Sequence, residues 1–332
     1  MDPVAWPSLA FSGAAAFDAA GRIPEDLEVS ARVRDSLEGR FFLGPSTAGE
    51  PRDGTILFLQ AAGPEALGRL DGLRGCLVLL PAGADPGSLA RGNAVLFARN
   101  PKYAYARLMT ELFPLVLQRG SFSAEPLPGV RTDPGFVLAD GVTIEPFVTI
   151  GRDSVIGRGT HVMRGASIGP RVRIGEGCMI GEDAVVGEPG FGFAFDGDRP
   201  PIRLPHLGGV LVGDRVEIGS HATVSSGTID PTVLGPDVKI NNHVHVGHNC
   251  RIGRGTLIGI GASVSGSTRI GERCWLSPGV LVRNKATVGD GVTAGMGAVV
   301  VKDVAAHQTV VGLPAKPTGN EVPWYESEKG TP

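Results

Sequence analysis

Branched aliphatic residues recur every six positions between Ile144 and Val300. A period of six fits neither an α-helix nor an ordinary strand, and self-similarity at a fixed period marks a repeat architecture. The pattern predicts a mainly β fold, a parallel β-helix of hexapeptides in which each aliphatic points inward and stacks on its equivalent three hexads away. The column is interrupted after Val186 and slips by four residues after Val224. Its slots are Ile144, Ile150, Ile156, Val162, Ile168, Ile174, Ile180, Val186, Val212, Ile218, Val224, Leu234, Ile240, Val246, Ile252, Ile258, Val264, Ile270, Leu276, Val282, Val288 and Val300.

Glycine usually follows the aliphatic slot, as at Gly151 and Gly169. We expect the chain to turn a corner there, with backbone angles that favour a residue without a Cβ. The 50 glycines and 26 prolines in 332 residues would be typical of a low-complexity chain if they were aperiodic, but they accompany a strict period and 42% hydrophobic residues. The composition therefore belongs to the repeat and not to a flexible tail.

Residues 1–125 lack the six-residue period and are predicted to form a small α/β domain. Three compact apolar runs bounded by Gly, Pro or Asn are strand candidates, and the segment after them has apolar residues at helical spacing behind an Asn-Pro start signal. The expected strands are Thr55–Gln60, Cys76–Leu80 and Ala94–Ala98, and the expected helix is Asn100–Phe113. Strands that alternate with helices favour a compact mixed domain.

The β-helix domain is expected over residues 126–305, after a Pro-rich linker within Ser121–Pro134. An irregular stretch, residues 188–209, interrupts the coils. A long loop ejected from a solenoid is more often a binding element than an accident. Residues 306–332 are expected to form a short C-terminal tail.

The charge and the cysteines narrow the class of protein. The net charge of -3 and the scattered Lys and Arg residues give no basic surface for nucleic acid. The four cysteines form no CxxC pair and no zinc spacing, so we expect reduced, buried thiols. The N-terminus lacks a basic start, which argues against a secretory signal, and no apolar run reaches membrane-spanning length. We therefore expect a cytoplasmic protein that does not insert into a membrane.

The densest polar cluster of the repeat is Asn241–Asn249, which holds three histidines. His248 is the candidate general base, because imidazole titrates near neutrality and accepts a proton from an attacking nucleophile. Gly266 lies three hexads further on, so its bare N–H is expected about 5 Å away on the next coil, where an oxyanion would be stabilised. Asn241, seven residues before His248, is a candidate to orient the ring through a hydrogen bond. The alternatives are that outward corners tolerate any polar residue and that Gly266 is one more corner glycine.

Five further residues are candidates for substrate binding. Arg283 and Lys285 lie one coil beyond Gly266 and suit a phosphate or a carboxylate, or else belong to the solvated surface. In the ejected loop, the side chains of Phe191, Phe193 and His206 are too apolar as a group for a purely solvated loop. Stacking on a sugar or base, or docking on a neighbouring subunit, would explain them.

The architecture also predicts an assembly. A solenoid with few polar partners on one face commonly buries that face between subunits, and the clefts between protomers supply deep, partly dry pockets. A closed cyclic trimer fits three-sided prisms packed side by side. We therefore expect a homotrimer.

Four segments of the chain carry the motifs of a known family. They read GFGFAFDGDRPPIRLPHLGGVLVGDRVEIGSHATV, KINNHVHVGHNCRIG, GMGAVV and, nearer the N-terminus, AVLFARNPKYAYARLM. The set, which spans residues 94–305, closely resembles the UDP-3-O-acylglucosamine N-acyltransferase family of lipid A synthesis. The resemblance implies a left-handed β-helix homotrimer with a nucleotide-binding N-terminal domain. It also implies transfer of a 3-hydroxyacyl chain from acyl carrier protein to the 2-amine of a UDP-linked glucosamine, with His248 as general base, Gly266 as oxyanion amide, and neither a metal nor a bound cofactor.

The chain departs from that family near the expected chemistry. The family usually has Asp where Asn241 stands, a histidine where Lys285 stands, and Asp-Arg where Ser225 and Ser226 stand. Its uridine-contacting stretch should fall near Leu57–Gly63, where the family's Asn and Tyr are absent. The ending VVGLPAKP resembles that of CoA-dependent hexapeptide acetyltransferases. The alternative within the class is therefore an acyl- or acetyl-CoA-dependent N-acyltransferase acting on another nucleotide amino sugar.

Two alternatives belong to other classes. Left-handed β-helix trimers that resemble γ-type carbonic anhydrases hold zinc with three histidines, two of them five residues apart. His243 and His248 have that separation, and His221 is a candidate third ligand. A non-catalytic scaffold that kept the fold is the other alternative, motivated by the departures from the family.

Overall fold

The chain forms two compact units. A computed structural model describes residues 9–23, 25–27, 35–113, 124–127, 129–314 and 316–317. One unit comprises Met1–Arg119 together with Gly192–Leu207, and the other comprises Gly120–Phe191 together with Gly208–Pro332. The loop predicted to leave the β-helix therefore belongs to the N-terminal unit.

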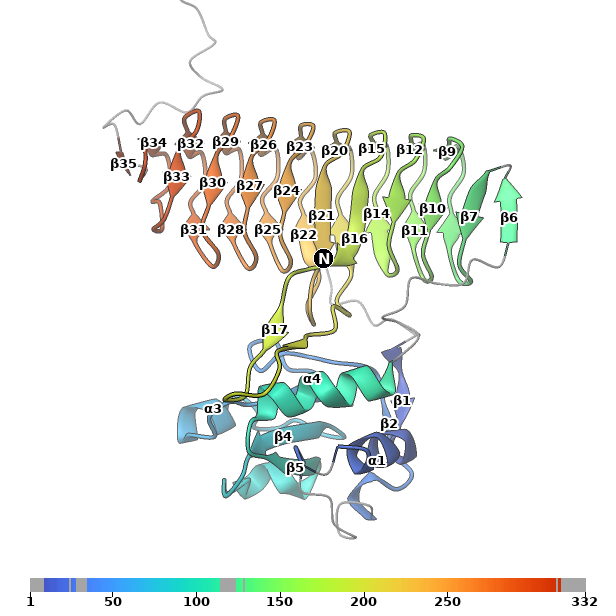
Figure 1. The fold of residues 1–332 in the computed structure, drawn as a ribbon, viewed down its shortest axis with the longest axis vertical. Coiled ribbons are helices and arrows are strands. Elements are labelled where there is room, and N and C mark those ends of the chain that lie inside the picture. Colours follow the sequence, from blue (N-terminus) through green and yellow to red (C-terminus); the bar gives the residue numbers. More distant parts are fainter. Residues whose placement is uncertain are drawn as a thin grey trace, which may run out of the picture. The chain divides into compact units, whose positions relative to one another are not determined.

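The second unit is the predicted left-handed parallel β-helix, built from three sheets (Figure 1). The first sheet contains β6 (Ala124–Leu127), β7 (Val130–Thr132), β10 (Thr149–Ile150), β13 (Ser167–Ile168), β16 (Val185–Pro189), β21 (Thr223–Ser226), β24 (His245–Val246), β27 (Ser263–Val264), β30 (Leu281–Val282) and β33 (Val299–Val300). The second sheet contains β8 (Val137–Leu138), β11 (Val155–Ile156), β14 (Val172–Ile174), β19 (Val210–Val212), β22 (Thr232–Leu234), β25 (Arg251–Ile252), β28 (Arg269–Ile270) and β31 (Thr287–Val288). The third sheet contains β9 (Thr143–Ile144), β12 (His161–Val162), β15 (Met179–Ile180), β20 (Glu217–Ile218), β23 (Lys239–Ile240), β26 (Leu257–Ile258), β29 (Trp275–Leu276), β32 (Thr293–Ala294), β34 (Thr309–Val311) and β35 (Lys316–Pro317).

The register of the strands confirms the six-residue period. Between β7 and β34, consecutive strands of the coils enter different sheets, so each pairs in parallel with the strand one coil away; Ile150, for example, lies beside Ile168. At the ends, β6 pairs antiparallel with β7, and β34 with β35. The aliphatic of each short strand is buried while the residue before it faces outward, as with Val246 and His245. Stacked aliphatics from successive coils form one continuous core, which supplies the main stabilising free energy of a solenoid.

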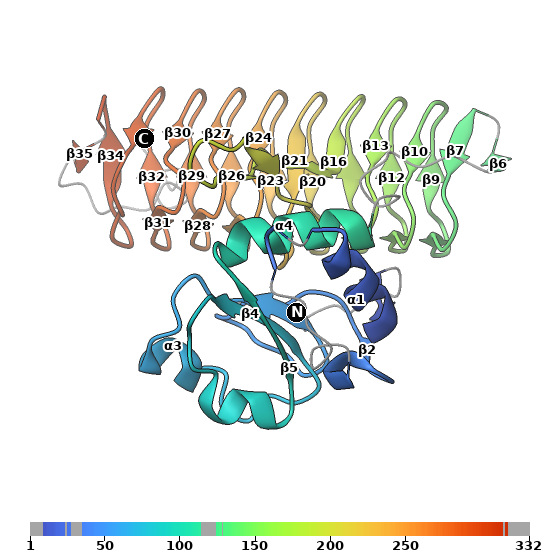
Figure 2. The same cartoon turned by 60° about the horizontal axis from the view of Figure 1, so that its bottom comes forward.

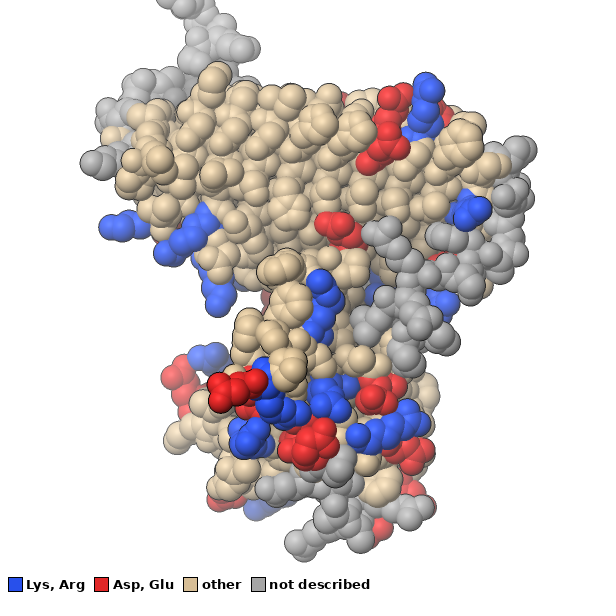
Figure 3. Space-filling view, viewed as in Figure 1, with Lys and Arg blue, Asp and Glu red and all other residues tan. Residues whose placement is uncertain are grey.

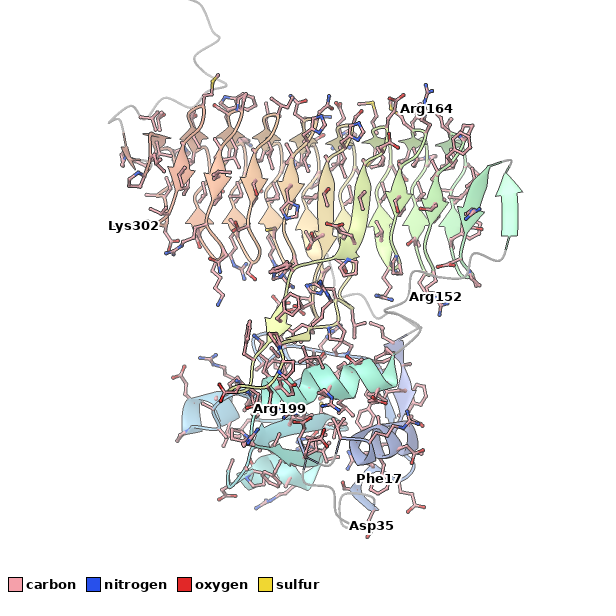
Figure 4. The ribbon with its side chains drawn as sticks, viewed as in Figure 1. Phe17, Asp35, Arg152, Arg164, Arg199 and Lys302 are labelled. Atoms are coloured by element: carbon pink, nitrogen blue, oxygen red, sulfur yellow. The ribbon has the colours of Figure 1, made fainter. Side chains whose placement is uncertain are left out.

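The corners between strands stack into three edges. The first edge, from the first to the second sheet, includes His248. The second edge, from the second to the third sheet, includes Asp237. The third edge, from the third sheet back to the first, includes His243. In Figure 4, Arg152 and Lys302 lie at the first edge and Arg164 lies at the third.

The prediction that the glycine after the aliphatic slot is needed for the backbone angles of the turn is wrong. Gly151 and Gly169 do not have left-handed backbone angles; the left-handed residue comes two positions later, as at Asp153 (φ 57°). A Cβ at Gly151 would lie 2.5 Å from the backbone nitrogen of Pro170 on the next coil. These glycines are required because successive coils approach each other closely at the corner, and not because the turn needs a positive φ.

The N-terminal unit is the predicted small α/β domain. Its parallel sheet has the order β3 (Ile56–Phe58), β4 (Leu77–Pro81), β5 (Ala94–Ala98), and helix α4 (Pro101–Leu112) packs on all three strands (Figure 2). The unit also contains α1 (Gly13–Gly21), α3 (Pro64–Gly68), the 3-10 helix η2 (Gly87–Arg91) and the antiparallel pair β1 (Phe11–Ser12) and β2 (Phe41–Phe42). Asn100 caps α4 as the Asn-Pro signal predicts, because its side chain accepts a hydrogen bond from the N–H of Tyr103 (3.2 Å). No helix in the described part of the chain combines the length and the apolar character needed to cross a bilayer.

The ejected loop folds back on α4 as an antiparallel hairpin of β17 (Phe193–Ala194) and β18 (Ile202–Arg203). Ala194 packs with Tyr103 and Ala106 of the helix in a small apolar cluster. Ion pairs fix the hairpin: Arg199 hydrogen-bonds Asp26 and Asp196, and Arg99 also pairs with Asp196 (Figure 4). The hydrogen bond from Arg99 is the main reason why the pKa of Asp196 is lowered. The loop is therefore anchored and not freely solvated.

The predicted linker Ser121–Pro134 lies partly outside the described residues, and its described part contains β6 and β7 of the first sheet. The β-helix thus already includes part of that segment.

The four cysteines are free and buried, as predicted from their spacing. Burial raises the pKa of Cys250 to about 12 and that of Cys274 to about 11. Their thiols therefore stay protonated at neutral pH and act as small apolar side chains.

Candidate functional site

His248 lies at the first edge, in the corner between β24 and β25. Its side chain is half-buried, so the ring is both supported and accessible. The hexad places it at this corner because Val246, two residues earlier, fills the core slot and directs the following residues around the edge.

Gly266 lies directly beside the His248 ring on the next coil, as the spacing predicts. A Cβ built on Gly266 would lie 2.6 Å from Nε2 of His248 and 2.9 Å from the two adjacent ring carbons. The φ of Gly266 is not positive, and the left-handed residue of this corner is Ser267 (φ 61°). Gly266 is therefore not an ordinary corner glycine: it is bare where the imidazole packs against it.

The backbone around Gly266 is held on both sides while its N–H stays available. The backbone N–H of Ser267 donates to the His248 carbonyl (2.7 Å), and the backbone N–H of Lys285 donates to the Gly266 carbonyl (3.1 Å). Among the described residues, no acceptor binds the N–H of Gly266 itself. A Cβ at Gly247 would lie 2.6 Å from that nitrogen, so a second glycine keeps this point of the edge open. A fixed, open N–H next to a histidine suits the stabilisation of an oxyanion.

The prediction that Asn241 orients the His248 ring is wrong for the protomer. Asn241 follows β23 at the third edge, where its Oδ1 accepts a hydrogen bond from the N–H of Asn242 (2.7 Å). It lines a shallow groove of about 290 Å³ on the third sheet, together with Leu257 and Trp275. The side chain that meets Nδ1 of His248 is Asn249, whose Oδ1 lies 3.0 Å away. The seven-residue spacing failed because it spans one strand and therefore changes the edge.

Arg283 and Lys285 lie at the first edge, on the coil beyond Gly266, in the corner after β30. Both side chains are exposed, and Lys285 has a left-handed backbone (φ 63°). Two exposed cations therefore lie on the same edge as His248.

The regular outward slots of the first sheet hold uncharged side chains, although Glu188 of β16 lies close enough to the site to act on His245. Figure 3 shows a broad face of the β-helix on which charged side chains are sparse. From β10 to β33 the outward slots of this sheet hold Thr149, Ser167, Val185, Thr223, His245, Ser263, Leu281 and Val299. The pKa of His245 is lowered, mainly because surrounding protein atoms desolvate its ring. The negative charge of Glu188 acts to raise this pKa, and the nearby His248 lowers it further. His245 is therefore predominantly neutral at neutral pH, although much of its side chain faces solvent.

The predicted substrate-binding residues of the loop have different surroundings. Phe191, two residues before β17, is 84% exposed. Phe193 is half-buried, and Arg203 lies over its ring at 4.8 Å. His206 is only 4% exposed, its Nδ1 donates to the Leu204 carbonyl (2.8 Å), and its ring packs against Gly192. In the protomer His206 supports the hairpin and offers little surface to a ligand, whereas Phe191 stays a candidate.

The histidines of the zinc alternative do not converge within one protomer. The rings of His221 and His243 stack at the third edge, with centroids 5.1 Å apart, whereas His248 lies at the first edge. In the described residues, no group of three or more His, Cys, Asp or Glu side chains has the arrangement of a metal site. A zinc site from these residues would need side chains of a neighbouring protomer.

Sequence comparisons find a hexapeptide-repeat family and relatives that are acyltransferases. The family model "Bacterial transferase hexapeptide (six repeats)" matches residues 153–188. UDP-3-O-acylglucosamine N-acyltransferase of Bordetella parapertussis is 38% identical over 127 residues, which are 37% of this chain and 35% of that protein. The enzyme of the same name from Caulobacter sp. is 36% identical over 144 residues, 42% of each chain. The matched segment thus spans well under half the length of these relatives.

Solved structures of similar fold are also acyltransferases. The UDP-N-acetylglucosamine acyltransferase of Bacteroides fragilis superposes with a TM-score of 0.55 at 26% identity, over 62% of this chain and 79% of that chain. The Francisella novicida enzyme of the same name gives 0.55 at 27% identity, over 61% and 73%. The chain thus contains hexapeptide repeats that form a left-handed β-helix, and over part of its length it is similar to UDP-3-O-acylglucosamine N-acyltransferases.

Proposed function

We propose that the protein is an N-acyltransferase that moves an acyl chain from a thioester to the amine of a nucleotide-linked amino sugar. The observation that carries this proposal is the packing of Nε2 of His248 against Gly266, whose N–H meets no acceptor among the described residues. The favoured acceptor is a UDP-3-O-acylglucosamine, because relatives similar to part of the chain carry that sugar in their names. The favoured donor is a 3-hydroxyacyl group on acyl carrier protein, as the resemblance of the sequence motifs implies.

The reaction requires alignment and one base. His248 accepts a proton from the sugar amine at Nε2 as the amine nitrogen attacks the thioester carbonyl carbon. The N–H of Gly266 donates a hydrogen bond to the oxyanion that forms. When the tetrahedral intermediate collapses, the carbon–sulfur bond breaks, and the imidazolium returns its proton to the leaving thiolate. The products are the amide and the free thiol, and neither a metal nor a covalent enzyme intermediate is required.

The cationic part of the first edge suits a phosphate of the nucleotide sugar. We expect Lys285→Asn and Arg283→Gln to raise KM for the nucleotide sugar about tenfold with a smaller effect on kcat, because charge-assisted hydrogen bonds to phosphate are lost. Asn is chosen at position 285 because it tolerates the left-handed backbone there. Steady-state kinetics at two salt concentrations measure the effect. Arg254→Gln is the matched control, since Arg254 is exposed and lies at the second edge; an equal rise in KM for this variant would argue against a specific phosphate contact.

A homotrimer is the proposed assembly. The uncharged outward slots of the first sheet, from Thr149 to Val299, suit burial against a second protomer, because burying them does not require an ion to be desolvated. Glu188 of β16 is a charged residue on the same sheet. The second edge instead carries solvated ion pairs, such as Arg158 with Glu176 (3.0 Å) and Arg215 with Asp237 (2.6 Å). This charge pattern supports an arrangement in which the second edge faces water and the first edge borders the neighbouring protomer.

An assay with several donors and acceptors tests the proposed reaction. The full-length protein is incubated with UDP-3-O-acylglucosamine or another nucleotide amino sugar, and with 3-hydroxyacyl carrier protein, acyl-CoA or acetyl-CoA. We expect free thiol to appear together with a sugar nucleotide heavier by one acyl group, detected by mass spectrometry. Product from CoA alone would select the CoA-dependent alternative. No product from any pair would favour the non-catalytic scaffold, and stoichiometric zinc in the purified protein would favour the zinc enzyme.

A further inference from the structure

We infer that Asn249, held in place by Thr228, is the positioning residue that fixes the tautomer of His248. This inference concerns the base of the proposed reaction and in that sense rests on the proposed function. It explains two features that the six-residue repeat does not require: an asparagine at position 249 and an irregular corner one coil earlier.

Asn249 is bound through both ends of its side chain. Its Oδ1 accepts hydrogen bonds from the backbone N–H of Thr228 (3.1 Å) and from the Thr228 hydroxyl (2.8 Å). Its Nδ2 donates to the backbone carbonyl of Asp230 (2.8 Å), and its own N–H donates to Oγ1 of Thr232 (2.8 Å). Asn249 also has a left-handed backbone (φ 58°), which asparagine tolerates better than most residues. The side chain is therefore fixed in position and in orientation.

These partners determine which end of the amide faces His248. A backbone N–H only donates and a backbone carbonyl only accepts, so the contacts with Thr228 and Asp230 identify the oxygen and the nitrogen of the amide. The atom that lies 3.0 Å from Nδ1 of His248 is the oxygen, which cannot donate. Nδ1 must therefore carry the hydrogen, and in the neutral ring the lone pair is on Nε2. Nε2 is the ring atom that lies nearest to Gly266, where the reaction is proposed to occur.

The irregular corner supplies the groups that hold Asn249. Between β21 and β22 the chain inserts residues 227–231, and the aliphatic column slips by four positions there. Because β21 pairs with β24, this corner stacks directly on the corner of His248 and Asn249. A Cβ at Gly227 would lie 1.8 Å from the Asp230 carbonyl oxygen, so the glycine permits the tight path that brings this carbonyl to Asn249. The break in the repeat therefore builds the support of the base.

Nitrogen NMR of the histidine rings tests the inference without any substrate. In the full-length protein labelled with nitrogen-15 at histidine, we expect the neutral ring of His248, assigned by its loss in His248→Gln, to carry hydrogen on Nδ1 and none on Nε2. In Asn249→Gly, which keeps the left-handed backbone, we expect the population to shift toward hydrogen on Nε2. Thr228→Val, which removes one hydrogen bond to Oδ1, should give a smaller shift in the same direction. His243→Gly, at a left-handed corner of the third edge, is the matched control and should leave the His248 signals unchanged.

Kinetics separate positioning from general structural support. Asn249→Gly should lower kcat about tenfold or more while KM changes little, because a base in the wrong tautomer offers no lone pair to the amine. Asn249→Asp should move the acidic limb of the pH profile to higher pH, since a carboxylate favours the imidazolium. The surrounding titratable groups are the same in every variant: His245, which interacts with His248, Glu188, which interacts with His245, and Lys285 on the coil beyond Gly266. Hydrogen on Nε2 of the neutral His248 ring in the wild-type protein would overturn the inference. Hydrogen on Nδ1 without turnover of any substrate pair would leave the tautomer assignment standing and contradict the proposed function.

Discussion

The His248→Ala variant is expected to lose acyl transfer by about 10²–10⁴-fold in kcat, because removal of a positioned general base costs that much. The melting temperature and the oligomeric state should stay close to those of the wild-type protein. The imidazole is half-buried at a corner and contributes nothing to the stacked aliphatic core. Product formation under saturating donor and acceptor, followed by mass spectrometry, measures the loss.

A second histidine serves as the control for this variant. His161 on β12 is also outward-facing and hydrogen-bonded to Glu145 (2.8 Å), but it lies on the third sheet. His161→Ala should retain wild-type turnover. Near-wild-type activity of His248→Ala would remove this residue from the mechanism, and equal losses in both variants would point to damage of the fold.

Replacing Gly266 with alanine is expected to lower kcat about 10²-fold, the loss associated with displacing a reacting group by roughly 1 Å. The new Cβ would lie 2.6 Å from Nε2, and the imidazole is the flexible partner that must move. The fold should tolerate the change because the φ of Gly266 is not positive. Gly68→Ala is the control, since an added Cβ at Gly68 meets no atom within 4 Å. We measure kcat and the melting temperature of both variants, and we expect only Gly266→Ala to lose activity.

The double variant tests whether Gly266 acts through the ring. In a His248→Ala background the added methyl has room, so Gly266→Ala should cost far less than it does in the wild-type protein. Independent losses that multiply in the double variant would show that Gly266→Ala damages something other than the position of the imidazole.

The fold of the β-helix could be predicted because its physical cause is periodic. Each aliphatic such as Ile150 or Ile168 fills the same kind of core slot, and the strand register repeats with the hexad. The role of the following glycine could not be predicted, because the close approach of Gly151 to Pro170 depends on the spacing between coils and not on the turn itself. Composition indicates where glycine recurs, but the backbone nitrogen that Gly151 avoids lies nineteen residues away, on the next coil.

In the candidate site, too, the contacts that follow the repeat could be predicted and those that depend on a break in the repeat could not. The pairing of His248 with Gly266 follows from the three-hexad spacing, since parallel strands carry that spacing into space directly. The partner of Nδ1 does not follow from spacing, because Asn249 is held by Thr228 in a corner that breaks the repeat. The four-residue slip after Val224 was the available signal: an interruption of a strict repeat next to a candidate base indicates that the inserted residues support it.

The loop that interrupts the coils, residues 188–209, shows a further limit of prediction from the sequence. Its aromatic residues indicate that it packs on something, but sequence alone does not separate exposed Phe191 from buried His206. Burial of His206 depends on the docking of the hairpin on α4, which is a tertiary contact between segments far apart in the chain.

A crystal structure of the protein with the N-acyl product bound tests the central claim most directly, because it places the reacting atoms against the two residues of the site. We predict the amide nitrogen of the product next to Nε2 of His248, and its carbonyl oxygen about 3 Å from the backbone nitrogen of Gly266. A product bound in another position, with His248 and Gly266 contacting only solvent, would contradict the account.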